Sequence, residues 1–101
     1  MPFMIETYDK PEAGDLRLRL RPAHLDYLEA NRHLLLACGA KLSDDGQAAS
    51  GGLYLVALET HAEAEAFIAA DPFHRGNLFD RVFITRWRQA YLDRRNTLEK
   101  G

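Results

Sequence analysis

The sequence predicts a single α+β domain over residues 1–101, with a core at about residues 2–88 and a charged C-terminal tail at 89–101. Three observations lead to this fold class. Four short segments are rich in leucine, β-branched or aromatic residues, two segments carry helix signals, and turn-forming residues separate them. A chain of this length can bury one modest core but not two. The predicted element order is β-α-β-β-α-β.

The first strand is expected at residues 2–8 (PFMIETY), which end in a turn-forming Asp-Lys-Pro-Glu. Residues 16–21 alternate leucine and arginine, a pattern that fits a strand by its period alone. Pro22 follows, however, and side chains from His24 to Asn31 then recur at helical spacing. We therefore expect a helix over about residues 15–31, restarted or kinked at Pro22, because proline is tolerated at a first helical position.

Two strands are predicted next, at Leu34–Leu42 (LLLACGAKL) and Leu53–Leu58 (LYLVAL). A turn at Ser43–Gly46 and the Gly51-Gly52 pair separate them, so we expect a hairpin with a long, mobile loop. Cys38 is the only cysteine, which excludes an internal disulfide. Because it lies in an apolar strand, Cys38 is predicted to be a small buried hydrophobe rather than a nucleophile.

The second helix is predicted at His61–Ala70, with Thr60 as N-cap and Glu63 completing a capping box. A last strand is expected at Val82–Trp87, and a helix is one option for the charged tail that follows. The complete order corresponds to the ferredoxin-like arrangement.

The predicted strands are apolar on both faces. The opposed sets are Leu34, Leu36 and Cys38 against Leu35 and Ala37, then Leu53, Leu55 and Ala57 against Tyr54, Val56 and Leu58, and finally Val82 and Ile84 against Phe83 and Trp87. Two helices can cover only one face of such a sheet, and a bare apolar face indicates an interface. We expect a second copy to cover it, which makes a homodimer. A monomer whose tail folds over the sheet is the alternative.

Composition excludes several classes of function. The net charge is −2 and the isoelectric point about 6.0, whereas a nucleic-acid binder needs clustered basic residues. An RNA-binding sheet would also need exposed stacking aromatics. No apolar run approaches the roughly 20 residues that span a bilayer, and the N-terminus lacks the pattern of a signal peptide. We therefore expect a cytoplasmic protein with no nucleic-acid or membrane partner.

Two short motifs hold candidate active-site residues. His24 lies in Arg-Pro-Ala-His-Leu (21–25), among apolar neighbours where an imidazole can carry protons near neutral pH. Asp71 lies in Ala-Asp-Pro-Phe (70–73) and is also a plausible N-cap for a helical turn that begins at Pro72. Taken separately, each residue has a structural explanation.

Together, these motifs and the Val-Phe-Ile of residues 82–84 resemble the YciI-like (YCII-related) family over about residues 3–87. The resemblance implies a dimeric α+β barrel whose active site pairs a histidine on the first helix with an aspartate after the second, here His24 and Asp71. Two departures stand out. The family commonly has Gly-Pro where this chain has Gly39-Ala40, near the pocket wall, and the tail is longer than in short members.

On this basis His24 would be the general acid/base and Asp71 the group that orients it. No serine or cysteine is placed to complete a hydrolytic triad. We therefore expect proton transfer on a small cyclic or aromatic compound, as in an elimination, an isomerisation or a dehydrochlorination-like step. A family member that acts on chlorinated hydroxyquinones fits this class. A non-catalytic ligand-binding or accessory module with the same pocket is the alternative.

Four further residues are candidates for substrate binding: Tyr27, Tyr54, His74 and Arg75. Arg75 would hold an anionic group, His74 would carry a second proton, and the tyrosines would line the cavity. We expect neither a metal nor a cofactor. A facial metal site from His24, Asp71 and His74 lacks support, because no paired histidines share one helix face.

Overall fold

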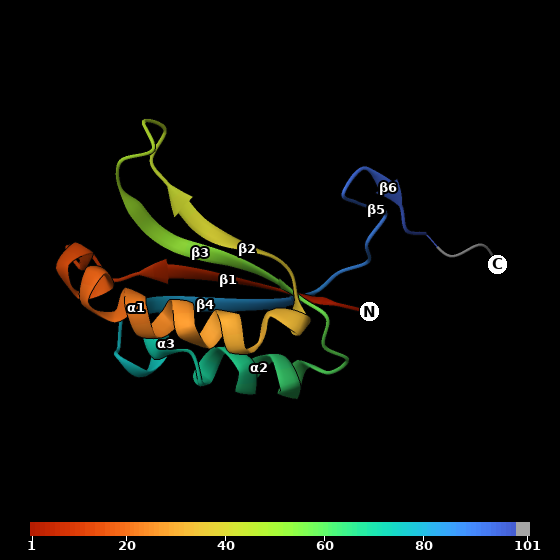
Figure 1. Cartoon of the computed structure of the whole chain (residues 1–101), viewed down its shortest axis with the longest axis horizontal. Helices are drawn as coiled ribbons and strands as arrows, with labels where there is room; N and C mark the ends of the chain where they lie inside the picture. The colour runs from red at the N-terminus through yellow and green to blue at the C-terminus, as the bar shows by residue number, and fades with distance from the viewer. Residues whose placement is uncertain (99–101) are drawn as a thin grey trace.

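The computed structural model describes residues 1–98, which fold into a four-stranded antiparallel sheet with its helices on one face (Figure 1). The strand order is β2-β3-β1-β4, which confirms the ferredoxin-like α+β fold. The elements are β1 (Phe3–Asp9), α1 (Gly14–Ala30), a 3-10 turn η1 (Arg32–Leu34), β2 (Leu35–Leu42), β3 (Ala49–Val56), α2 (His61–Ala69), α3 (Pro72–Arg75), β4 (Phe79–Arg86), β5 (Tyr91–Leu92) and β6 (Arg95–Asn96).

Helix α1 runs through the leucine–arginine alternation, as predicted, with Pro22 inside it. A proline removes the hydrogen bond to the carbonyl four residues earlier, here that of Leu18. Both residues are exposed, so they lie on the solvent side of the helix, where water can bind the freed carbonyl.

The hairpin of β2 and β3 is tighter than expected. β3 begins at Ala49 rather than at Leu53, so the predicted long loop is wrong and the connection spans only residues 43–48. A hydrogen bond from Ser43 N to Ala48 O closes it at 2.9 Å, and Asp45 accepts hydrogen bonds from the Ser43 hydroxyl and the Gln47 amide. The small residues at the start of β3 pair with β1 and β2 through backbone hydrogen bonds. Their side chains carry no strand pattern, so the sequence did not reveal this pairing.

A bulge in β2 changes which residues share a face. Leu35 pairs with Val56 and Ala37 with Leu55, so Leu36 is the additional residue. The expected alternation is therefore wrong before Cys38: Leu35 and Cys38, not Leu36, lie on the same face as Val56.

The helical option for the tail is not realised in the described residues. Within residues 1–98 the tail forms a short hairpin, β5–β6, whose two-residue loop, Asp93 and Arg94, has φ values of 51° and 65°. Two positive φ values are typical of a type I′ turn. The hairpin lies beyond the end of the sheet and not over its open face (Figure 1).

The hydrophobic core lies between the sheet and the helices. Its buried side chains come from β1, β3 and α2: Phe3, Ile5, Tyr54, Val56, Ala64, Phe67 and Ile68. The opposite face is not wholly apolar, contrary to expectation. It exposes Leu53 and Phe83, but Lys41 pairs there with Glu6 at 3.3 Å and lies 3.2 Å from the ring centroid of Tyr8. None of the described helices is long and apolar enough to cross a membrane.

Candidate active site

Asp71 is held in place by the junction between α2 and α3. The predicted capping box of Thr60 and Glu63 starts α2, which ends at Ala69. Asp71 is then the N-cap of α3, and its Oδ1 accepts a hydrogen bond from the Phe73 amide at 2.8 Å. This agrees with the N-cap prediction. The Asp71 side chain is completely buried, so its carboxylate needs partners from within the protein.

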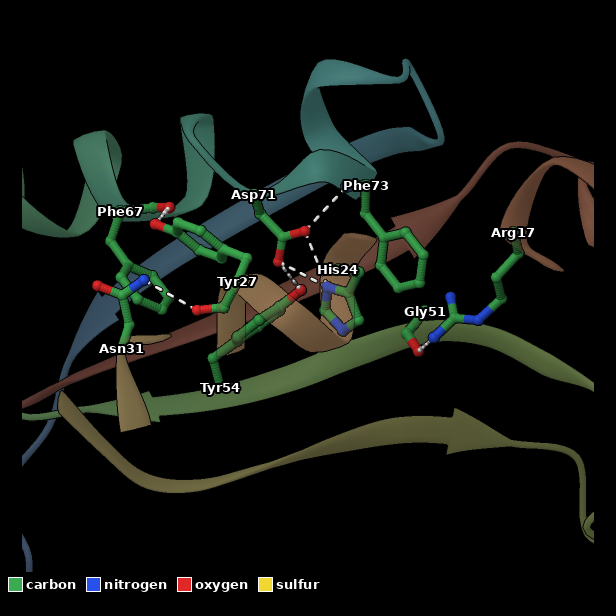
Figure 2. Close-up of polar contacts among 9 residues, drawn as sticks. All are labelled: Arg17, His24, Tyr27, Asn31, Gly51, Tyr54, Phe67, Asp71 and Phe73. Atoms are coloured by element: carbon green, nitrogen blue, oxygen red, sulfur yellow. Dashed lines mark hydrogen bonds and ion pairs between the residues drawn. The ribbon is translucent and has the colours of Figure 1, made fainter. Parts of the chain in front are cut away.

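His24 and Tyr54 supply those partners. His24 Nδ1 lies 2.8 and 2.9 Å from the two carboxylate oxygens, and the Tyr54 hydroxyl donates to Oδ2 at 2.8 Å (Figure 2). Because an ionised carboxylate only accepts hydrogen bonds, Nδ1 of His24 carries a proton. In the neutral imidazole, Nε2 therefore has the free lone pair. No hydrogen bond among the described residues uses Nε2.

Aromatic packing holds the imidazole in this orientation. The Phe73 ring stacks on His24 with centroids 3.8 Å apart and planes inclined by 12°. The Tyr54 ring meets the imidazole edge-on at 6.3 Å. The same two residues also bind the Asp71 carboxylate, so the pair and its packing form one rigid unit.

A cavity of about 200 Å³ lies next to this unit, between α1 and the sheet. Helix α1 contributes Arg17, Arg21, His24, Leu25 and Leu28 to its wall. The sheet contributes Thr7, Cys38, Gly39, Ala40, Gly52 and Tyr54, and Phe73 completes the lining. Asp71 is not part of the wall, but its three hydrogen-bond partners, His24, Tyr54 and Phe73, all line the cavity. The Gly39-Ala40 position does lie in the wall.

Burial favours the neutral forms of two side chains in the sheet wall, the Tyr54 hydroxyl and the Cys38 thiol. It raises the pKa of the Tyr54 hydroxyl far above its usual range, and the charge of Asp71 adds to that effect. The same two causes, in the same order, raise the pKa of the Cys38 thiol to about 11. Cys38 is nevertheless exposed in the single chain, at the edge strand β2, so its prediction as a buried hydrophobe is wrong.

The structure brings together three of the six predicted site residues, namely His24, Asp71 and Tyr54. The Tyr27 hydroxyl instead donates to the Phe67 carbonyl at 2.7 Å, outside the cavity lining. His74 and Arg75 are exposed on α3. His74 lines a separate hollow of about 380 Å³ between α2 and β4.

Sequence reasoning missed Thr7, Arg17 and Arg21. For the arginines a signal was present, because Arg17, Arg21, His24 and Leu28 recur at intervals of three or four residues on one face of α1. For Thr7 there was none, since its place depends on strand pairing. Among residues 1–98, no three His, Cys, Asp or Glu side chains gather where they could hold a metal ion.

The sheet, its one-sided helices and a buried His–Asp pair beside a cavity define a ferredoxin-like α+β protein. The chain belongs to the family of YCII-related domains, whose model matches residues 1–88.

One solved structure agrees with this assignment. The chain is 28% identical to 5-chloro-2-hydroxyhydroquinone dehydrochlorinase from Burkholderia phenoliruptrix AC1100, whose structure contains 2,5-dihydroxybenzoquinone; the match covers 87% of this chain and 94% of that one, with a TM-score of 0.81. An antibiotic biosynthesis monooxygenase is 17% identical, over 87% of this chain and 98% of that one, with a TM-score of 0.48. No curated protein matches the chain. The family and the dehydrochlorinase structure support a small-molecule enzyme.

Proposed function

We propose that this protein is an enzyme that transfers a proton on a small cyclic or aromatic compound, with His24 as the catalytic base and acid. The observation that carries the proposal is the bidentate contact of His24 Nδ1 with the buried Asp71 carboxylate at 2.8 and 2.9 Å. It leaves Nε2 of a residue that lines the cavity free to accept a proton. Asp71 is the positioning residue, because it acts through the imidazole.

The reaction would proceed in two parts. Nε2 of His24 takes a proton from an O–H or C–H group of the substrate, and the electron pair left behind forms a new double bond. In an elimination such as a dehydrochlorination, the leaving group departs with the electrons of its own bond, as chloride would, and the imidazolium then releases its proton to water. In an isomerisation, the new double bond displaces the electrons of an adjacent double bond, and His24 returns the proton to the atom that receives them. Asp71 stabilises the imidazolium that exists between the two parts.

We also propose that the chain is one domain that pairs with a second copy through the open face of the sheet. Leu53 and Phe83 are 38% and 47% exposed on that face. Exposed apolar side chains that share one face favour an interface, because a second copy would remove them from water. Leu53→Asp together with Phe83→Asp should convert a dimer to a monomer in analytical ultracentrifugation. The control is Leu18→Asp, because Leu18 is exposed on the far side of α1. A wild-type monomer would refute the pairing.

The catalytic proposal can be tested with a panel of single-ring hydroxyquinones and chlorinated hydroxyhydroquinones. Turnover is followed by chloride release and by exchange of substrate protons in D₂O. We expect His24→Gln and Asp71→Asn each to lower kcat by about a thousandfold, as loss of a catalytic base or of its correct tautomer does. His33→Gln is the matched control, because His33 is exposed on the turn before β2.

Two outcomes would overturn the catalytic proposal. The first is full turnover by the His24→Gln variant, which would place the chemistry elsewhere. The second is binding of panel compounds without turnover of any, which would assign the protein to the ligand-binding or accessory class.

A further inference from the structure

The Thr7 hydroxyl has no hydrogen-bond partner within the described chain, although Thr7 is completely buried. A buried hydroxyl without a partner is costly and uncommon in native proteins. Thr7 lies in β1 on the face that packs against the helices, and it belongs to the cavity lining. The unused hydrogen-bonding capacity is therefore at the wall of the same cavity that His24 lines.

Gly52 leaves space beside that hydroxyl. It pairs with Thr7 across β1 and β3. A Cβ atom at Gly52 would lie 3.4 Å from Thr7 Oγ1, 3.4 Å from the Gly39 carbonyl oxygen and 3.5 Å from Tyr54 Cε1. A ligand oxygen that binds the hydroxyl would approach it from the cavity, because Thr7, Gly52 and Tyr54 all line the same cavity. The missing side chain keeps this corner of the cavity open.

The charged groups of the wall are all cationic. Arg17 and Arg21 line the cavity, one turn apart on α1, and no aspartate or glutamate lines it. Arg17 uses one amino group on Asp9 at 2.6 Å and the other on the Gly51 carbonyl at 3.3 Å. Asp9 offsets the charge of Arg17. Arg21 is exposed and forms no ion pair with residues 1–98, so its guanidinium is available to a bound anion.

We propose that Thr7, Arg17 and Arg21 form a subsite for an ionised oxygen of the ligand, in the cavity that also contains His24. The ligand class is a single-ring compound that carries a phenolate, an enolate or a carboxylate. The cavity of about 200 Å³ fits this size, because an apolar cavity of roughly 150 Å³ binds benzene. The ring would contact Leu25, Leu28 and Phe73, and the Thr7 hydroxyl would donate to the oxygen. This inference rests on the proposed function for the site, but not on turnover.

The test compares benzoate with benzamide, which has nearly the same shape and no charge. Affinities are measured for the full chain by NMR titration at pH 7, and 2,5-dihydroxybenzoquinone serves as a second anionic probe. We expect benzoate to bind at least about tenfold more tightly than benzamide. Thr7→Val and Arg21→Gln should each weaken benzoate binding by about tenfold, and Arg21→Gln should leave benzamide binding unchanged. The matched controls are Thr85→Val and Arg19→Gln, whose side chains are exposed outside the cavity.

A thermal melt separates a binding role of Thr7 from a structural one. Thr7→Val removes a hydroxyl without a partner and preserves the shape, so Tm of the free protein should stay the same or rise. A clear fall in Tm would instead show that the hydroxyl supports the fold and would remove Thr7 from the subsite. Equal affinities for benzoate and benzamide, or equal losses in Arg21→Gln and Arg19→Gln, would overturn the subsite as a whole. So would the absence of any binding up to about 10 mM of either anionic probe.

The outcome is distinguishable from that of the catalytic proposal. His24→Gln should keep benzoate affinity within about threefold, because the base is not among the three groups of the subsite. A charge preference without turnover would support the subsite and refute the enzyme. Turnover of panel compounds without a charge preference would do the opposite.

Discussion

Two histidine–carboxylate pairs in this protein have nearly equal lengths and very different surroundings. His24 and Asp71 are 2.8 Å apart, with side chains 10% and 0% exposed. His61 and Glu65 are 2.6 Å apart, with side chains 56% and 62% exposed. The first pair joins residues 47 positions apart in the sequence, whereas the second lies on one face of α2, four residues apart.

Contact distance alone does not show how firmly a histidine–carboxylate pair is held. In the buried pair, the carboxylate is also bound by the Tyr54 hydroxyl and the Phe73 amide, so it has a single orientation. In the exposed pair, water competes for both groups and salt screens their attraction. Both pairs lie next to a hollow, but only the hollow beside the buried pair, which His24 lines, has a wall of both apolar and cationic side chains.

The largest difference should appear when each carboxylate is removed. Asp71→Ala takes away the N-cap of α3 and leaves two buried donors without an acceptor, so we expect a loss of about 3 kcal/mol in the free energy of unfolding. Glu65→Ala should cost no more than about 0.5 kcal/mol. Urea denaturation of both variants measures the contrast. Equal losses would contradict the distinction between the two pairs.

The charge of Asp71 should also be felt across the cavity by Cys38. Burial and that charge raise the pKa of the Cys38 thiol from its ordinary 9.0 to about 11. The thiolate fraction at pH 8 is then about a hundredfold lower than in a free cysteine. Alkylation by iodoacetamide should therefore accelerate up to about pH 11, and Asp71→Asn should shift this profile to lower pH. An unchanged profile in Asp71→Asn would show that the charge of Asp71 does not reach β2, and a wild-type profile centred at the ordinary pKa would contradict the effect of burial as well.

The sign of the linked stability change follows from the same shift. The folded state favours the neutral thiol, so this contribution to stability is complete below pH 9 and is lost as the pH rises toward about 11. Cys38→Ser should remove that part of the alkaline decline in urea denaturation measured at pH 8 and at pH 10.

Tyr54→Phe is expected to have a smaller effect. It removes one of the donors to Asp71 but keeps the ring that packs on His24, at a cost of about 1 kcal/mol in the free energy of unfolding. The kcat of any established reaction should fall by less than about tenfold, because the His24–Asp71 contact remains. A loss as large as that of Asp71→Asn would make Tyr54 a direct participant in the reaction.

The smallest effect belongs to the exposed pair. His61→Gln should change the free energy of unfolding by no more than about 0.5 kcal/mol, and high salt should abolish the difference. Turnover should be unchanged. A measurable loss of activity would direct attention to the hollow between α2 and β4, where His61, Glu65 and His74 meet.

Local signals predicted much of this fold and part of the site. The capping box of Thr60 and Glu63 and the N-cap at Asp71 involve hydrogen bonds over two or three residues, so they are legible in the sequence. The family resemblance singled out His24 and Asp71, although neither residue stood out by itself. The face of α1 that holds Arg17 and Arg21 was also present as a helical spacing.

The sequence by itself therefore determined the order of the main elements, the caps at Thr60 and Asp71, and the pairing of His24 with Asp71 at 2.8 Å. Only the tertiary structure decided the bulge at Leu36, the early start of β3 and the placing of Thr7 opposite Gly52. It also decided that Tyr54 reaches Asp71 while Tyr27 bonds to Phe67. The physical reason is range. Caps and helical faces depend on neighbours within one or two turns, whereas strand register and cavity walls depend on pairings across the whole chain.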